Sequence, residues 1–137
     1  MARKVFIVLV AVLFAVPVMA QNLIGLSKEQ AEQEIKKSYP GYVPDRSAVN
    51  HTYKYLKYIN KFDERTLLVF LSDGDSCTSV KMVYDYSAIE DVKTDLSKKY
   101  TPAGTDQWIY SIKGVVYMVK LKREEWFFTV FMSKKRD

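Results

Sequence analysis

Two segments of the chain carry the same amphipathic pattern, and this repetition constrains the fold more than any other feature of the sequence. The segments read LSKEQAEQEIKKSY and YSAIEDVKTDLSKKY, and in each the apolar residues recur at helical spacing along one face. A shift of 61 positions superposes them, pairing Ala31 with Val92, Ile35 with Leu96 and Tyr39 with Tyr100. We therefore expect one structural unit written twice, over about residues 27–86 and 87–133.

Capping residues mark where both helices should begin. Ser27 and Ser87 are each followed three residues later by Gln or Glu, the arrangement of a capping box. A pair of lysines closes each segment, which suits the negative end of a helix dipole. The sequence thus predicts helices over about 28–38 and 88–99.

Each predicted helix is followed by a turn-rich linker, PGYVPDRSAVN or TPAGTD, and by three strand-like runs. The six runs cover about 51–60, 66–72 and 77–86 in the first half and 107–112, 115–121 and 126–133 in the second. Because short connections join neighbouring runs, the strands should pair antiparallel. The predicted fold class is α+β: tandem helix-plus-three-strand repeats that form an antiparallel sheet with two helices packed on one face.

Residues 1–20 have the composition of an export signal. Two basic residues precede the apolar stretch VFIVLVAVLFAVPV, and Val18 and Ala20 occupy the −3 and −1 positions of a cleavage site. A membrane anchor is the alternative, but the apolar run is shorter than the roughly 20 residues that a bilayer requires. We expect cleavage before Gln21 and export to the periplasm or the medium, with no membrane anchor left after cleavage.

The mature chain, residues 21–137, has the size of one modest domain. Loss of the two basic residues of the signal lowers the basic count from 21 to 19 against 16 acidic residues, so the net charge falls from +5 to +3. This mild excess of positive charge does not indicate a nucleic-acid partner. Cys77 is the one cysteine of the chain, so no internal disulfide is expected and the hydrophobic core must stabilise the fold.

The segment FLSDGDSC gathers two aspartates, a serine and the cysteine behind an apolar run. Asp73-Gly74 lies between two strand-like runs, where Asp-Gly indicates a hairpin turn with a positive φ at the glycine. A calcium loop would need more oxygen ligands at fixed spacings and a closing glutamate. We therefore predict a turn and no metal site.

A nucleophilic Cys77 would need His51, the one histidine of the chain, as its base. In the predicted meander these residues lie at the same end of the sheet with a strand between them, about 10 Å apart. This distance exceeds hydrogen-bond reach, so the sequence predicts no catalytic residue, and it contains no pattern that calls for a cofactor.

Several predicted strands are apolar on both sides. In the last strand Phe128, Val130 and Met132 share one side, while Phe127 and Phe131 share the other. Two short helices cannot easily cover both sides of a sheet, so one face should be covered by a partner, by a second copy or by the linker 40–50. The candidate partner surface consists of Val116, Met118, Phe127 and Phe131.

The helix end IKKSYPGY, the strand pairs around Asp73-Gly74 and the duplication resemble the PepSY-like and β-lactamase-inhibitor-like group of small exported bacterial proteins. The resemblance covers the layout of most of residues 27–133. It implies a fold of helices on antiparallel sheet, without an enzyme site, in which the sheet face binds protein.

The expected function is that of an exported, non-enzymatic protein-binding module, such as an inhibitor or an envelope accessory protein. Its partner would be another protein or a second copy of the chain, bound through the sheet face. Three alternatives stay open: a structural or assembly domain without a ligand, a hydrolase that uses Cys77, and a glycan-binding module that uses Trp108, Tyr110 and Tyr53.

Overall fold

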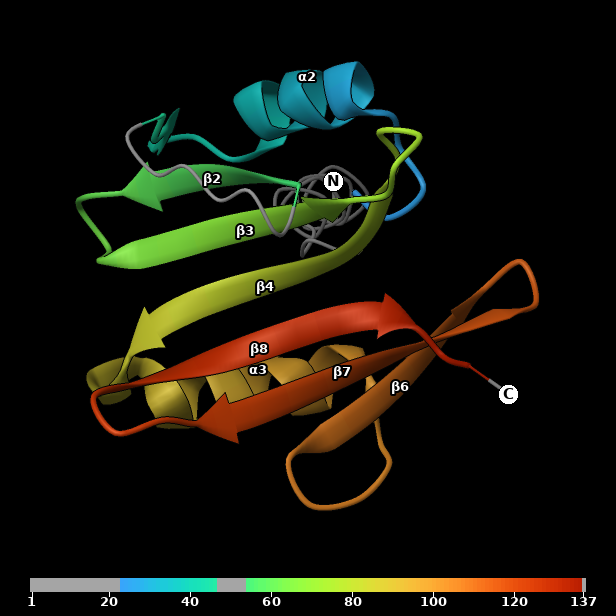
Figure 1. Ribbon diagram of the computed structural model, residues 1–137. Helices are drawn as coiled ribbons and strands as arrows, with labels where there is room; N and C mark the ends of the chain where they lie inside the picture. The colour runs from blue at the N-terminus through green and yellow to red at the C-terminus, as the bar shows by residue number, and fades with distance from the viewer. Residues whose placement is uncertain (1–22, 47–53, 137) are drawn as a thin grey trace, which may run out of the picture.

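The computed structural model describes residues 23–46 and 54–136, and their main body is one antiparallel sheet of eight strands. The strands are β1 (Tyr42–Pro44), β2 (Tyr55–Asn60), β3 (Arg65–Leu71), β4 (Cys77–Asp85), β5 (Thr101–Pro102), β6 (Gln107–Ile112), β7 (Val115–Arg123) and β8 (Phe127–Lys134). Their order across the sheet is β1-β2-β3-β4-β8-β7-β6-β5, and Figure 1 shows β2, β3, β4, β8, β7 and β6 side by side in this order. The pairing of β4 with β8 therefore joins two halves that are distant in the sequence.

Two helices of 11 residues each accompany the sheet, α2 (Lys28–Ser38) and α3 (Ile89–Lys99). The predicted capping box of α2 is confirmed. The Gln30 backbone N–H donates to Ser27 Oγ at 3.2 Å, and the Ser27 backbone N–H donates to Gln30 Oε1 at 3.0 Å. These bonds satisfy donors that the first turn of a helix leaves without partners.

The predicted Ser87 cap of the second helix is wrong. The Asp85 carboxylate accepts hydrogen bonds from the Ser87 backbone N–H at 2.9 Å and from the Ser87 hydroxyl at 2.6 Å. This arrangement starts a short 3₁₀ turn, η2 (Tyr86–Ala88), which leads into α3 without a side-chain cap at Ala88. Asp85 at the end of the preceding strand thus takes the position that the sequence pattern suggested for Ser87.

The predicted tandem repeat of one helix and three strands, with two helices packed on one sheet face, is wrong. The described residues are mostly sheet, and the short helices form no covering layer, because each buries only two side chains: Ala31 and Ile35 in α2, Val92 and Leu96 in α3. Both linkers contain edge strands, since β1 pairs with β2 and β5 pairs with β6. Each of these strands ends at a proline. Proline has no backbone N–H to donate, and an edge strand tolerates this because the N–H groups on its outer side need no partner strand. In the sequence alone, the same prolines indicate turns.

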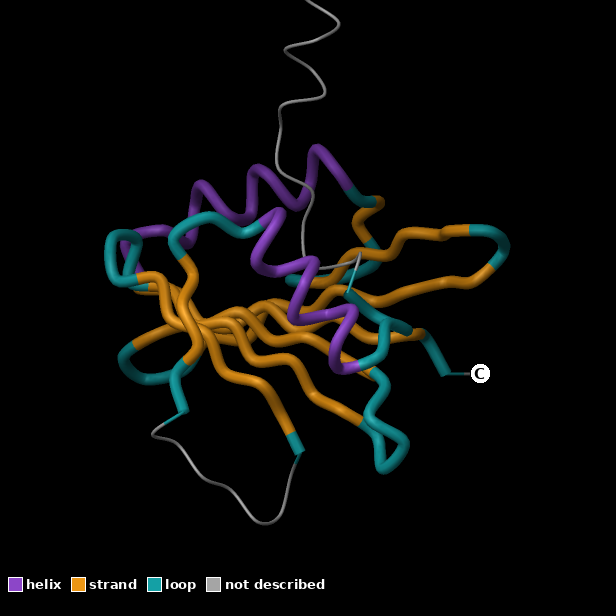
Figure 2. Tube along the Cα trace, turned by 90° about the horizontal axis from the view of Figure 1, so that it is seen from above, coloured by secondary structure: helices purple, strands orange, loops and turns teal. Residues whose placement is uncertain are grey.

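Side chains alternate between the two faces of the sheet, and one face carries the core. The strand residues buried there are Tyr58, Leu67, Val69, Cys77, Val80, Met82, Tyr84, Trp108, Val119, Leu121, Phe128, Val130 and Met132. Tyr84 and Phe128 are direct cross-strand partners, and their rings stack at 4.9 Å between centroids. Both helices lie on this side of the strands, but as two short segments that each bury two side chains and not as a layer that covers the face (Figure 2).

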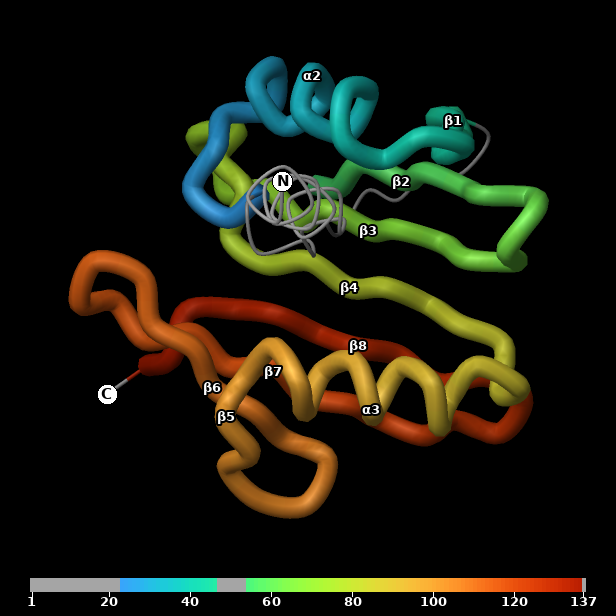
Figure 3. The backbone as a smooth tube through the Cα atoms, turned by 180° about the vertical axis from the view of Figure 1, so that it is seen from behind, coloured from blue at the N-terminus to red at the C-terminus, as the bar shows by residue number. Residues whose placement is uncertain are grey.

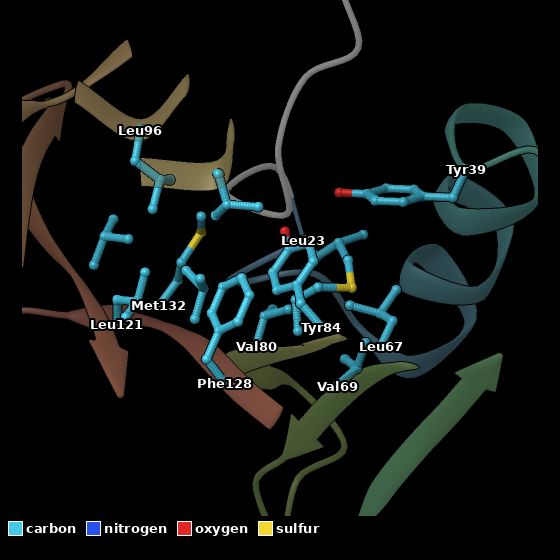
Figure 4. Packing of buried hydrophobic residues seen from close by; sticks show 14 of the residues in the cluster. Leu23, Tyr39, Leu67, Val69, Val80, Tyr84, Leu96, Leu121, Phe128 and Met132 are labelled. Atoms are coloured by element: carbon cyan, nitrogen blue, oxygen red, sulfur yellow. The ribbon is translucent and has the colours of Figure 1, made fainter. Parts of the chain in front are cut away.

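The segment before α2 completes the core. The two helices are separated along the sheet (Figure 3), and Leu23 lies in the middle of the buried cluster, between Leu96 of α3 and Tyr39 at the end of α2 (Figure 4). Leu23 is 0% exposed. Backbone hydrogen bonds from Gly25 N to Cys77 O (2.8 Å) and from Cys77 N to Leu26 O (2.7 Å) attach this segment to the start of β4.

Candidate partner-binding face

The sheet face that points away from both helices is called here the open face (Figure 2). Its residues alternate with those of the core. In the two central strands they are Ser79, Lys81, Val83 and Asp85 of β4 and Phe127, Thr129, Phe131 and Ser133 of β8. Most of these side chains are neither fully buried nor fully exposed. The open face is therefore the surface on which the predicted partner site has to be examined.

One line of direct cross-strand partners crosses the middle of the open face. The register pairs Lys57 with Leu68, Leu68 with Lys81, Lys81 with Phe131, Phe131 with Lys120, and Lys120 with Gln107. We call these six residues the central row. From Lys57 to Lys120, lysines alternate with apolar side chains along it. Because neighbouring strands lie about 4.8 Å apart, successive lysines of the central row are about 10 Å apart.

Two depressions meet at the central row. One, of ≈ 950 Å³, is lined by residues of β2, β3, β4 and β8, and the other, of ≈ 440 Å³, by residues of β4, β6, β7, β8 and the loop before β6. Both include Lys81 and Phe131 in their lining. In the adjacent row Ser79 pairs with Ser133, two small side chains that leave space in the centre of the face. Lys81 and Phe131 thus form the ridge between two hollows.

The lysines of the central row differ in their partners. Lys57 Nζ lies 3.3 Å from Asp45 Oδ2, and this ion pair is partly shielded from solvent. Lys81 Nζ lies 6.0 Å from the centroid of the Phe131 ring, in cation–π geometry. Within the described ranges no carboxylate lies at ion-pair distance from Lys81 or Lys120. The centre of the open face therefore carries two lysines that form no ion pair with a carboxylate of the described residues, and Asp106, which pairs with Lys93 and Arg123, lines the smaller depression beside them.

All four residues of the predicted partner surface lie on the open face, but the structure brings only two of them together. Met118 and Phe131 occupy adjacent rows and line a common depression of ≈ 720 Å³. Phe127 is 39% exposed at the other end of β8, about 13 Å from Phe131 at roughly 3.3 Å per residue. Val116 lies near the tip of the β6–β7 hairpin, where its partner is Ser111.

The partner surface predicted from the sequence did not include Lys81 and Lys120. It also did not include the part of the open face that β2, β3 and β4 contribute. The apolar residues Val80, Met82 and Tyr84 alternate along β4, and this pattern places Lys81 on the opposite side of the strand. The same alternation places Lys120 of β7 opposite the buried Val119 and Leu121. No local pattern indicated that β4 pairs with β8, and this pairing brings Lys81 beside Phe131.

The FLSDGDSC segment forms the turn between β3 and β4 that the sequence predicts, but with different backbone geometry. The positive φ lies at Asp75 (φ 59), and Gly74 does not adopt one. The Asp75 N–H donates to the Ser72 carbonyl at 2.9 Å, and the Asp75 carboxylate pairs with Lys54, which lowers the pKa of Asp75. Among the residues that the structure describes, no cluster of His, Cys, Asp or Glu could hold a metal ion.

Cys77 is a buried residue at the start of β4. Its side chain is 2% exposed, and Sγ lies 3.6 Å from the Ser79 carbonyl oxygen. Burial raises the pKa of the Cys77 thiol to about 11. A nucleophilic cysteine needs the opposite, a lowered pKa and access to solvent. The other member of the candidate dyad, His51, lies outside the described residues.

Of the aromatic residues considered for glycan binding, Trp108 is buried and Tyr110 is partly buried. Trp108 is 3% exposed, and its Nε1–H donates to Ser97 Oγ at 3.1 Å. Tyr110 stacks on Tyr100 with ring centroids 4.8 Å apart, on the core side of the sheet. Tyr53 lies outside the described residues. Trp108 is therefore a core residue and offers no flat platform to a sugar.

The linker 40–50, considered as a cover for the sheet, runs along the sheet edge in the part that the structure describes. Residues 42–44 form β1, and the Asp45 N–H donates to the Lys57 carbonyl at 2.8 Å, so this part extends the sheet beside β2. Residues 47–50 lie outside the described ranges, as do the predicted signal peptide and its cleavage site.

No protein-family model, curated protein or solved structure matches this chain. Neither α2 nor α3, the α-helices of the described ranges, is long and apolar enough to cross a membrane.

Proposed function

We propose that this chain is an exported, non-enzymatic protein-binding module whose binding surface is the open face of the sheet. The observation that carries the proposal is the ridge of Lys81 and Phe131 between two depressions, with apolar side chains on both sides. Burying a large apolar side chain contributes roughly 1.5–3 kcal/mol, so partly exposed residues such as Leu68 and Phe131 favour association with another surface.

A heterologous partner is favoured over a second copy bound by the same face. In a two-fold symmetric dimer the same patch appears on both subunits, so such a dimer would bring the central rows of the two copies together. Lys81 and Lys120 of one copy would then approach like charges of the other, which is unfavourable at an interface that excludes water. The charge of the open face thus supports a different protein as the partner.

Two observations support a non-enzymatic function. The Cys77 thiol is buried with a raised pKa, and Asp75 of the β3–β4 turn forms an ion pair with Lys54. Export to the periplasm or the medium, following cleavage before Gln21, is part of the proposal and rests on the composition of residues 1–20. An inhibitor and an envelope accessory protein both fit this description.

The test compares three forms of the mature chain as bait for proteins of the native envelope and medium. The forms are the unchanged chain, the Phe127→Ser/Phe131→Ser variant, and a Phe62→Ser control that removes an aromatic residue 90% exposed in the β2–β3 turn. We expect the double variant to lose the captured protein while its Tm stays close to that of the control. A large fall in Tm in a protein that remains monomeric would instead identify the face as ordinary core and remove the proposal.

A further inference from the structure

The spacing of charges along the central row specifies more than a generally acidic partner. From Lys81 the row continues to Phe131 one strand away and to Lys120 two strands away. At about 4.8 Å per strand, the sequence of groups is cation, ring and cation at about 0, 5 and 10 Å. A matching ligand needs an acid, an apolar group and an acid at the same intervals along one line.

An α-helix laid across the strands has these intervals. With a rise of about 1.5 Å per residue, positions i, i+3 or i+4, and i+7 lie on one side of a helix at about 0, 4.5 to 6, and 10.5 Å. A bound strand fits less well, because its same-face residues recur about every 6.7 Å and fall out of step with the row. The row extends beyond Lys81 to Lys57, so the full distance from Lys57 to Lys120 is about 19 Å, or three to four helical turns.

We propose that the open face binds an amphipathic helix of its protein partner, laid across β2 to β7, with acidic residues at i and i+7 over Lys81 and Lys120 and apolar residues at i+3 and i+4 over Phe131. This inference rests on the proposed function and adds the class of partner. Helix-in-groove recognition commonly uses anchors at this spacing. The two depressions on either side of the Lys81–Phe131 ridge, of ≈ 950 and ≈ 440 Å³, provide the space for the apolar side chains.

The pairing of Lys57 distinguishes it from the other two lysines. Its ammonium group is 3.3 Å from the Asp45 carboxylate, so an acidic residue at i−7 would compete with an existing partner. Lys81 and Lys120 have no such competitor among the described carboxylates. The charge recognition should therefore depend on Lys81 and Lys120 more than on Lys57.

The probe is a capped peptide of about 18 residues in an Ala/Gln background, held helical by a crosslink between outward-facing side chains. The in-phase peptide matches the spacing of the central row: it carries Glu at every seventh position, and Leu at the i+3 and i+4 positions between successive Glu residues. The out-of-phase peptide has the same composition with each Glu moved two places, about 200° around the helix. Fluorescence anisotropy should give a dissociation constant roughly tenfold lower for the in-phase peptide, and raising salt from 0.1 to 1 M, which shortens the screening length from about 10 to about 3 Å, should weaken it.

Variants of the protein test which lysines are used. Lys81→Glu/Lys120→Glu should weaken the in-phase peptide roughly tenfold or more. Lys36→Glu/Lys98→Glu, which makes the same change in net charge on the two helices, should leave binding unchanged. A peptide with Lys in place of Glu should bind the Lys81→Glu/Lys120→Glu protein better than it binds the unchanged chain. Circular dichroism checks that each variant is folded.

The inference is overturned if the in-phase peptide does not bind, if both peptides bind equally, or if the charge reversal on the open face has no larger effect than the control. These results leave the proposed function standing when a natural partner is still captured in a Phe131-dependent manner. If the Phe127→Ser/Phe131→Ser variant loses the partner and its Tm also falls by a large amount, the open face is ordinary core, and the proposed function and this inference are both removed.

Discussion

Lys81 of β4 and Phe131 of β8 are direct cross-strand partners, and the Lys81 ammonium lies 6.0 Å from the centre of the Phe131 ring. The two residues are 50 positions apart and come from different halves of the chain, and both line the depressions of ≈ 950 and ≈ 440 Å³ on the open face. Their contact connects the fold to the proposed function, because the β4–β8 pairing that joins the halves also creates the centre of the open face.

This contact should be measurable without a partner. Phe131→Leu and Lys81→Met each remove the cation–π pair while keeping an apolar side chain on the open face. Since such pairs contribute about 0.5–1 kcal/mol at partly exposed sites, a double-mutant cycle in urea should give a coupling energy of about that size. Additive single effects within error would show that the two side chains do not stabilise each other.

Two adjacent phenylalanines provide a matched test of the sheet faces. Phe128 is 0% exposed and stacks on Tyr84, whereas Phe127 is 39% exposed on the open face. Phe128→Ala should lower the free energy of unfolding by about 3–5 kcal/mol, while Phe127→Ala should cost well under half as much. Equal losses in chemical denaturation would contradict the register of β8.

The β3–β4 turn should depend on Asp75 more than on Gly74. Asp75 has a φ of 59, a region that Gly and Asn enter readily and that β-branched residues resist. We expect Asp75→Asn and Asp75→Gly to leave Tm nearly unchanged and Asp75→Val to lower it by several degrees. Gly74→Ala is the control, because Gly74 has no positive φ and the nearest atom to an added methyl group is 3.9 Å away. A larger loss in the control than in Asp75→Val would contradict the turn geometry.

Cys77 should react slowly with thiol reagents and should make stability depend on alkaline pH. Its pKa rises from the ordinary value of 9.0 to about 11 in the folded protein, so the folded state holds the proton more tightly than the unfolded state does. The resulting stability is complete below pH 9 and is lost as the pH rises from 9 to 11, with a slope of at most about 1.4 kcal/mol per pH unit for one proton.

Unfolding experiments between pH 8 and pH 11 check this dependence. The slope between pH 9 and 11 should be shallower in Cys77→Ala than in the unchanged chain. Buried tyrosines also contribute to the loss above pH 10 in both proteins, since burial raises the pKa of Tyr84 to about 12. Fast labelling of Cys77 in the folded protein at neutral pH would contradict its burial and revive the hydrolase hypothesis.

Leu23 connects the predicted processing site to the core. It is 0% exposed, and it lies two positions after Gln21, where we predict that the mature chain begins. Leu23→Ala in the mature chain should lower the free energy of unfolding by about 2–5 kcal/mol, as replacement of other fully buried leucines does. Gly25→Ala should also lower it, because Gly25 has a φ of 94, which residues with a side chain rarely adopt. Intact mass of the exported protein checks the start at Gln21. A mature chain that begins after Leu23 would contradict both the site and the packing.

Local features of the fold were predictable from the sequence because they depend on neighbours in the chain. The Ser27 capping box, the extent of α2, the turn around Asp73-Gly74 and the alternation within β4 and β8 each follow from side chains a few residues apart. The same alternation was sufficient to place Phe127 and Phe131 on a different side from Phe128, and Val116 and Met118 on a different side from Val119.

The tertiary structure decided which strands are neighbours, and local patterns carry no information on this. The prolines of β1 and β5 look like turn signals until an edge position makes their missing N–H harmless. The central row exists only because β4 pairs with β8, which places Lys81 and Lys120 on either side of Phe131. The sequence by itself therefore determined which residues can face the same side of a strand, and long-range pairing determined which of them meet, because backbone hydrogen bonds join strands irrespective of their side chains.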